Sequence, residues 1–253
     1  MLRVASRQPG FIPWVGFWSR LAAVDLYVAV VGTQFTHHDE ALLNRVRLNG
    51  SWLTVPVQRN GVQPFCGVRI VPGSLPKVFK TIRQTFGRRL PHSGRVQNLV
   101  DAVEETLSRH MTGDCEYLRL WEFNLLWIRE VGRALDLSCR VSVNFDERSG
   151  PPEEKTLRLF RRVRDTVEVT FVGSHAYEYY AGSKTVSYMN RTQIPPAVVV
   201  WEQCVKPDNP YGYDSILHVL ANERDPLGFL KQISTWRLST ETADAPIVRF
   251  PAP

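Results

Sequence analysis

Three residues that could move a proton follow the first long apolar run of the sequence. His37, His38 and Asp39 come after Leu26–Gly32, whose unbroken apolar character is typical of a strand buried on both faces. Open α/β sheets bind their ligands at the carboxyl ends of such strands, and a neutral imidazole can accept a proton from an amine. We predict that one of these histidines is a general base oriented by Asp39; the alternative is an incidental pair in a surface loop.

A further histidine and a small polar motif follow a later predicted strand. His175 comes just after Val167–Val172 and would reach the same edge of the sheet. Gly182, Ser183 and Lys184 resemble the end of a phosphate loop, but the glycine four residues upstream is missing, so we reject a Walker motif. A backbone nest that binds a phosphate is the remaining functional interpretation.

The segment that would position these residues is a strand, a tight turn and a helix in succession. Arg3–Ser6 is the predicted strand, and Gln8, Pro9 and Gly10 end it. Pro13 is expected in the first helical turn, where its missing N–H is tolerated. An apolar stripe at helical spacing follows: Trp14, Phe17, Trp18 and Leu21.

We predict a ligand cleft at the carboxyl ends of the first strands. Its expected lining residues are Gln8, Gly10, Trp14, Gln34 and Arg45. Trp14 and Phe17 would form a wall of this cleft, while Trp18 and Leu21 would belong to the core.

Three more residues are binding candidates, and they are considered together with Arg45. Gly16 is small enough for a ligand to approach the helix N-terminus, which favours anions; the alternative is that Gly16 relieves crowding in a packed Trp/Phe stripe. Arg45 offers bidentate contacts to phosphate or carboxylate, although alternate strand residues that face solvent look the same. Asn44 precedes Arg45, and Tyr211 completes the set.

These motifs resemble the WbqC-like family of bacterial glycan gene clusters. The resemblance implies a Rossmann-like fold and transfer of a glycyl or other acyl group to an amino sugar. Two departures affect residues of the family pattern: Val31-Gly32 replaces a pair of aspartates, and His218 replaces an aspartate of the closing helix. The matching segments are Gln8–Asp25, Gln34-Phe35, Asn44–Gly50, Ser51–Val57, Tyr179–Met189 and Ser215–Asn222.

The chain of 253 residues carries a net charge of +6, and its basic residues are clustered. One cluster is expected on a helix over Lys77–Phe86 and the other on a helix over Lys155–Arg164. Both could be solvated helix faces or could bind an acidic partner: a tRNA, an acidic carrier protein or a nucleotide-activated sugar. If an acidic macromolecule binds there, affinity should fall steeply with salt.

The four cysteines, Cys66, Cys115, Cys139 and Cys204, lack metal-ligand spacing, so we expect reduced thiols, no metal and no cofactor. The first residues do not form a secretory signal, and no apolar run approaches the ~20 residues needed to span a bilayer. We therefore expect a cytoplasmic protein with no membrane partner. No GxSxG elbow marks a nucleophile.

Alternating strands and helices predict an α/β fold with a largely parallel sheet. Residues 1–238 would form one domain, with an antiparallel insertion at about 44–71, and residues 239–253 a loose tail. The remaining predicted elements are strands over Arg45–Leu48, Trp52–Val57, Gly67–Val71, Arg140–Phe145 and Ala197–Glu202, and helices over Val96–Leu107, Leu118–Leu135, Tyr213–Asn222 and Pro226–Ile233.

We expect an aminoacyl or acyl transferase that forms an amide on an amino-sugar acceptor, by direct aminolysis of an activated donor carried by a tRNA or a carrier protein. Two alternatives remain open. One is a nucleotidyltransferase or ATP-dependent ligase, which Trp14 and Phe17 disfavour because phosphate-binding histidines stand at those positions in such folds. The other is a non-catalytic binding subunit.

Overall fold

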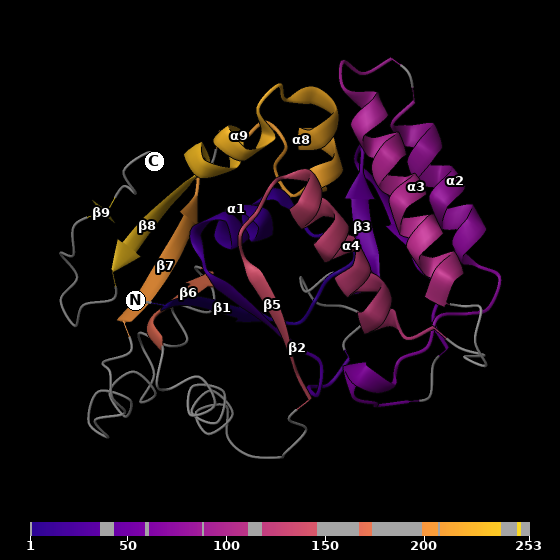
Figure 1. Cartoon of the computed structure of the whole chain (residues 1–253), viewed down its shortest axis with the longest axis horizontal. Coiled ribbons are helices and arrows are strands. Elements are labelled where there is room, and N and C mark those ends of the chain that lie inside the picture. The colour runs from indigo at the N-terminus through magenta and orange to yellow at the C-terminus, as the bar shows by residue number, and fades with distance from the viewer. Residues whose placement is uncertain are drawn as a thin grey trace.

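The computed structural model describes residues 2–35, 43–58, 61–87, 89–110, 118–145, 167–173, 199–206, 208–238 and 247–248. These residues form a sheet in the order β5-β2-β1-β6-β7-β8-β9 (Figure 1). The first five strands of that order are parallel and the last two are antiparallel, which confirms the α/β class. The strands are β1 Leu2–Arg7, β2 Leu26–Val30, β5 Arg140–Asn144, β6 Val167–Gly173, β7 Val199–Val205, β8 Ser234–Leu238 and β9 Ile247–Val248.

The strand order contains a switch point between β1 and β6. From β1 the chain builds outward through β2 to β5, then returns to add β6 and β7 on the other side of β1. Connections that leave neighbouring strands in opposite directions open a crevice at their carboxyl ends, where ligands of such folds bind. The turn after β1 lies at that position.

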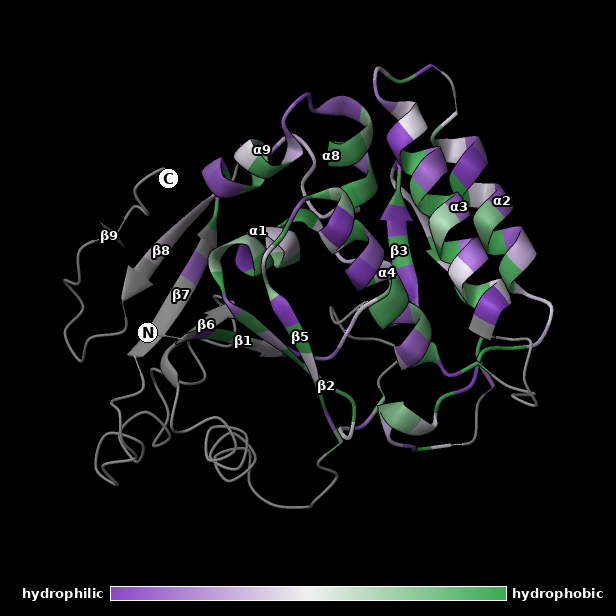
Figure 2. Ribbon diagram, viewed as in Figure 1, coloured by the Kyte–Doolittle hydropathy of each residue, from purple (hydrophilic) through white to green (hydrophobic). Residues whose placement is uncertain are grey.

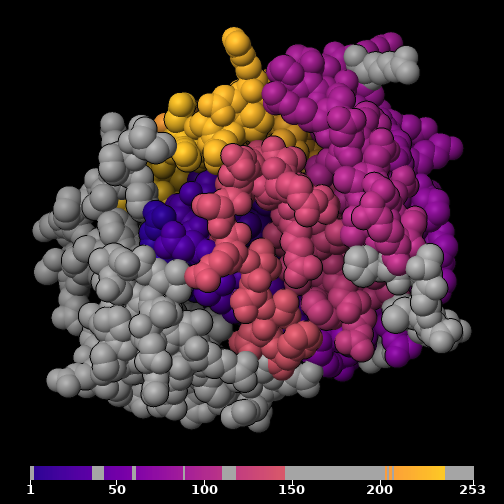
Figure 3. Space-filling model, in the orientation of Figure 1, coloured from indigo at the N-terminus to yellow at the C-terminus, as the bar shows by residue number. Residues whose placement is uncertain are grey.

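The helices of the described chain lie around the sheet in two groups. Helix α1 contacts α8 and α9, while α8 also contacts α3, and α3 packs on both α2 and α4; Figure 1 shows α8 between these groups. In Figure 3 the N-terminal segment (indigo) is enclosed between the C-terminal segment (yellow) and residues of α4 and β5 (pink). The bounds are α1 Val15–Ala23, α2 Leu75–Thr85, α3 Ser93–His110, α4 Leu120–Ala134, α8 Ile216–Asn222 and α9 Pro226–Gln232.

Side-chain caps fix the starts of the last two helices. The Ser215 hydroxyl accepts the Leu217 N–H at 3.2 Å before α8, and the Asp225 carboxylate accepts the Gly228 N–H at 2.9 Å before α9. Each cap satisfies a backbone donor that the first turn leaves without a partner.

Two predictions about the first helix, α1, are wrong. Its N-cap is Trp14, so Pro13 lies before the helix; the Pro13 carbonyl accepts the indole N–H of Trp18 at 3.0 Å. Phe17 is a core residue and does not line a cleft, because its ring is only 2% exposed and packs edge-on against Tyr27. The prediction that Trp18 belongs to the core is confirmed.

A hairpin of β3 Arg45–Leu48 and β4 Ser51–Thr54 forms a separate small sheet. Asn49 and Gly50 both have positive φ, 48° and 78°, which matches the twist that a two-residue hairpin turn needs.

The strand predicted over Gly67–Val71 is wrong. The chain instead forms the 3-10 helix η1 Phe65–Gly67, followed by isolated bridges at Arg69 and Ile70. Val68 and Ile70 are buried and Arg69 between them is exposed, so the predicted alternation of buried and exposed residues is present. The residues bond to separate segments and not to one continuous strand.

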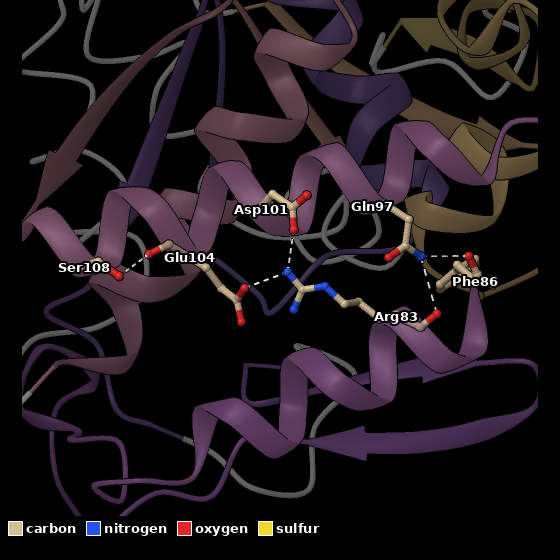
Figure 4. A network of polar contacts seen from close by, with 6 residues as sticks. All are labelled: Arg83, Phe86, Gln97, Asp101, Glu104 and Ser108. Atoms are coloured by element: carbon tan, nitrogen blue, oxygen red, sulfur yellow. Dashed lines mark hydrogen bonds and ion pairs between the residues drawn. The ribbon is translucent and has the colours of Figure 1, made fainter. Parts of the chain in front are cut away.

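Helices α2 and α3 are joined by an arginine that bridges them (Figure 4). Arg83 donates to Asp101 at 2.5 Å and to Glu104 at 2.6 Å, while the Gln97 carboxamide donates to the Phe86 carbonyl at 3.0 Å. Figure 2 shows hydrophilic and hydrophobic bands alternating along both helices, as expected of helices with one buried face.

The structure does not describe one predicted helix, and it shows a strand within the predicted C-terminal tail. The basic helix predicted over Lys155–Arg164 lies outside the described residues. Within the predicted tail, β9 pairs with β8, and β8 was not predicted.

Candidate ligand site at the carboxyl ends of the strands

The structure brings together the segments that follow β1 and β2. The Gln8 side chain, one residue after β1, donates from Nε2 to the Gln34 carbonyl at 3.0 Å. The Gln34 side chain is exposed, whereas Gly10 is buried in the turn. Two predicted lining residues therefore join adjacent strands at the carboxyl edge of the sheet.

A buried asparagine that sequence reasoning missed fixes this turn. Asn124 is fully buried on α4, and its Nδ2 donates to the carbonyls of Pro9 at 2.8 Å and Leu43 at 2.7 Å. Its Oδ1 has no hydrogen-bond partner in the described part of the chain. The signal in the sequence was a polar residue within Phe123–Ile128, a stretch of α4 that is otherwise apolar.

The two residues that flank the predicted histidine loop are both anchored. The Phe35 N–H donates to the Gln63 carbonyl at 3.0 Å, and Leu43 is held by Asn124. Both side chains are buried.

Seven of the predicted site residues lie outside the described residues, so their placement is not part of this structure. They are His37, His38, Asp39, His175, Gly182, Ser183 and Lys184.

Trp14 and Gly16 form a close contact at the start of α1. A Cβ on Gly16 would lie 2.3 Å from Cη2 of the Trp14 ring, so only glycine allows the indole to fold over the helix. The Gly16 carbonyl accepts Nε2 of Gln203 at 2.7 Å. The close approach of the Trp14 ring to Gly16 supports the interpretation that Gly16 relieves crowding.

Two further candidates have structural partners. Asn44 is buried and exchanges hydrogen bonds with Val55, donating from Nδ2 at 3.1 Å and accepting at its carbonyl at 2.7 Å. The Tyr211 hydroxyl donates to Glu223 at 2.5 Å, and burial raises the pKa of this phenol. Tyr211 therefore secures the segment around α8.

Arg20 is a buried cation on α1. Its Nε and Nη2 donate to Oε1 of Gln203 at 3.0 and 2.9 Å, and burial lowers the pKa of Arg20 to about 9. Gln203 also donates to the Ser234 hydroxyl at 3.0 Å. This network ties α1 to β7 and β8.

Cysteine chemistry is disfavoured at Cys139, which lies just before β5. Burial raises the pKa of Cys139 to about 11, so this thiol is protonated at neutral pH and is a poor nucleophile.

His218, which departs from the family pattern, is buried on α8. Its Nε2 accepts the Asn49 N–H at 3.3 Å, and its ring packs edge-on against Phe86 at 4.8 Å. Burial lowers the pKa of His218. The ring is therefore neutral and supports the hairpin turn.

An apolar cavity of about 530 Å³ lies elsewhere, between α2, α3 and the segment before α2. Val71, Leu75, Phe79 and Leu107 are among its lining residues, none of which was predicted as a site residue.

The fold and this site define an α/β protein with its candidate ligand site at the carboxyl ends of β1 and β2, next to the switch point of a largely parallel sheet. The chain belongs to the WbqC-like protein family, which matches residues 8–199.

The chain is also similar to the uncharacterized protein Rv1507c of Mycobacterium tuberculosis (strain ATCC 25618 / H37Rv), with 36% identity over 63 residues. The match covers 24% of this chain and 27% of the relative, so it spans about a quarter of that protein's length. No solved structure matches the chain significantly. Among the described residues, no helix is long and apolar enough to cross a membrane.

Proposed function

We propose that this protein is an aminoacyl or acyl transferase that forms an amide on an amino sugar. The supporting observation is the convergence of the turns after β1 and β2, joined by the bond from Gln8 to Gln34, at the edge where α/β sheets bind ligands. In sequence, His37, His38 and Asp39 lie between the anchored Phe35 and Leu43. Membership of the WbqC-like family is consistent with this proposal.

The proposed reaction is direct aminolysis of an activated donor. The sugar amine attacks the acyl carbon of a thioester or an aminoacyl ester, a C–N bond forms, and the C–S or C–O bond to the carrier breaks. The proton that the amine loses passes to an imidazole of His37 or His38, oriented by Asp39, and then to the departing thiolate or alkoxide. A base in this position accelerates such a step by roughly 10²–10⁴-fold; His175 is the alternative base.

Direct aminolysis is consistent with the chemistry of the described residues. The reaction needs a positioned amine and a base, and no acyl-enzyme. The Cys139 thiol, with its pKa raised by burial, is unsuited to forming one.

The test is to incubate the purified protein with a nucleotide-linked 4-amino sugar and a panel of donors, aminoacyl-tRNA and acyl-carrier thioesters, and to detect the amide by mass spectrometry. We expect amide from one donor class without ATP. Amide formation that requires ATP, with ATP consumed, would contradict the proposal and favour a ligase.

A further inference from the structure

The outward face of the β3–β4 hairpin carries cations beside aromatic rings. Val46 and Leu48 point into the core, so the alternate residues Arg45 and Arg47 lie on the other face. Arg47 is directly opposite Trp52 in the antiparallel register, and the Arg45 guanidinium lies 4.7 Å from the centre of the Trp52 ring.

The segment before α8 extends this face. The Ser215 N–H donates to the Arg47 carbonyl at 3.2 Å, and Nε of Arg47 lies 3.4 Å from Oδ1 of Asp214. The Tyr213 ring packs on Trp14 with centroids 5.1 Å apart. We define the hairpin face as Arg45, Arg47, Trp52 and Tyr213.

The aromatic rings of the hairpin face are unusually open to solvent. Trp52 is 50% exposed and Tyr213 is 68% exposed. Nε of Arg45 is buried and has no hydrogen-bond partner among the described residues. Exposed rings next to guanidinium groups suit a ligand that has both a flat ring and negative charge.

We propose that the hairpin face binds the nucleoside diphosphate of a nucleotide-linked sugar. Guanidinium groups form paired, charge-assisted hydrogen bonds with phosphate oxygens, and a nucleobase stacks on an exposed aromatic ring. Among the described residues, the carboxylate of Asp214 forms an ion pair with Arg47 and offsets one of the two positive charges. Two arginines against one carboxylate leave the face attractive to a diphosphate.

The position of the hairpin face deepens the proposed function, on which this inference rests. Arg45 is two residues after Leu43, which Asn124 ties to the turn after β1, and Tyr213 touches Trp14 at the start of α1. A nucleotide held on the hairpin face brings its attached sugar to the edge of the site at Gln8 and Gln34.

Isothermal titration of the whole chain with UDP, inorganic pyrophosphate and uridine tests the inference. We expect saturable UDP binding that Arg45→Ala and Arg47→Ala each weaken by about tenfold or more. Tyr213→Ala should weaken the affinity for UDP by about tenfold but leave the affinity for pyrophosphate unchanged, because only the nucleobase stacks on this ring. Arg129→Ala, which removes an exposed arginine of α4, is the matched control and should bind UDP as the parent does.

UDP affinity that is equal in the parent and both arginine variants would overturn the inference, as would an equal loss in Arg129→Ala. Tighter binding of a single-stranded oligonucleotide to the same face would also overturn it and identify a nucleic acid as the occupant.

If amide forms on a nucleotide-linked acceptor as fast in Arg47→Ala as in the parent, the inference fails and the proposed function stands. If UDP binds as predicted but no donor yields amide, the inference stands and the proposed function fails.

Discussion

Trp14 is the N-cap of α1 and Phe17 lies in its first turn, yet their environments differ. Phe17 is in the core between Trp18 and Tyr27, whereas Trp14 is partly exposed beside Tyr213. We expect Phe17→Ala to lower the free energy of unfolding by about 3–5 kcal/mol and Trp14→Ala by less than half of that. Urea unfolding measures both; an equal loss would show that Trp14 belongs to the core.

Asn124 should be essential to the turn after β1. Asn124→Ala leaves the buried Pro9 and Leu43 carbonyls without this donor, at a cost of about 1–3 kcal/mol for each group that stays unsatisfied. Asn98→Ala, at an exposed position of α3, is the control, since it makes the same change in a helix without those partners. Thermal unfolding that ranks the two variants equally would contradict this role.

His218 should make stability depend on pH. Because burial lowers its pKa in the folded state, the unfolded chain binds a proton first as pH falls below about 6.5. The contribution of His218 to stability is therefore constant above that value and declines below it, by at most about 1.4 kcal/mol per pH unit, until the folded protein also takes up the proton.

The control for this pH effect is His218→Gln, which keeps an acceptor for the Asn49 N–H and does not titrate. Its urea midpoint should fall less than that of the parent between pH 7 and pH 5. Parallel pH curves for the two proteins would remove His218 from the explanation.

At the scale of the elements, one basic residue of α2 forms ion pairs within the fold, while others are exposed to solvent. Arg83 joins α2 to α3 through Asp101 and Glu104, whereas Lys77 and Lys80 are exposed. Because Arg83 is partly exposed, solvent screens the ion pair, and we expect Arg83→Met to lower the free energy of unfolding by only about 0.2–1 kcal/mol. The effect should vanish in 1 M salt, and Lys80→Met should show neither the loss nor the salt dependence.

Local periodicity predicts most of the elements. The stripe in α2 and the alternation in β3 correspond to the observed helix and strand, because their spacing is set by one buried face. The same alternation around Val68 and Ile70 was misleading, since period two also occurs where a loop packs on the core without a continuous partner strand. Strand β8 was missed because its antiparallel pairing with β7 is a tertiary contact that the local sequence does not encode.

At the scale of the whole molecule, long-range contacts determine the site and could not be predicted from spacing alone. The sequence indicated Gln8 and Gln34 because each follows a predicted strand. It gave no indication that Asn124 on α4 would hold Pro9 and Leu43, or that the hairpin would meet the segment before α8 through Arg47 and Ser215. Those contacts depend on how helices and strands assemble.

In the proposed function, the edge of the sheet after β1 and β2 carries out acyl transfer with a base from the segment that follows Gln34. The most direct measurement is the rate of amide formation at saturating donor for the parent, the His37→Ala and His38→Ala variants and the double variant. We predict that the double variant loses roughly 10²–10⁴-fold in rate while its unfolding midpoint is unchanged. A double variant that keeps its rate within a few fold of the parent would exclude His37 and His38 as the base and contradict this mechanism.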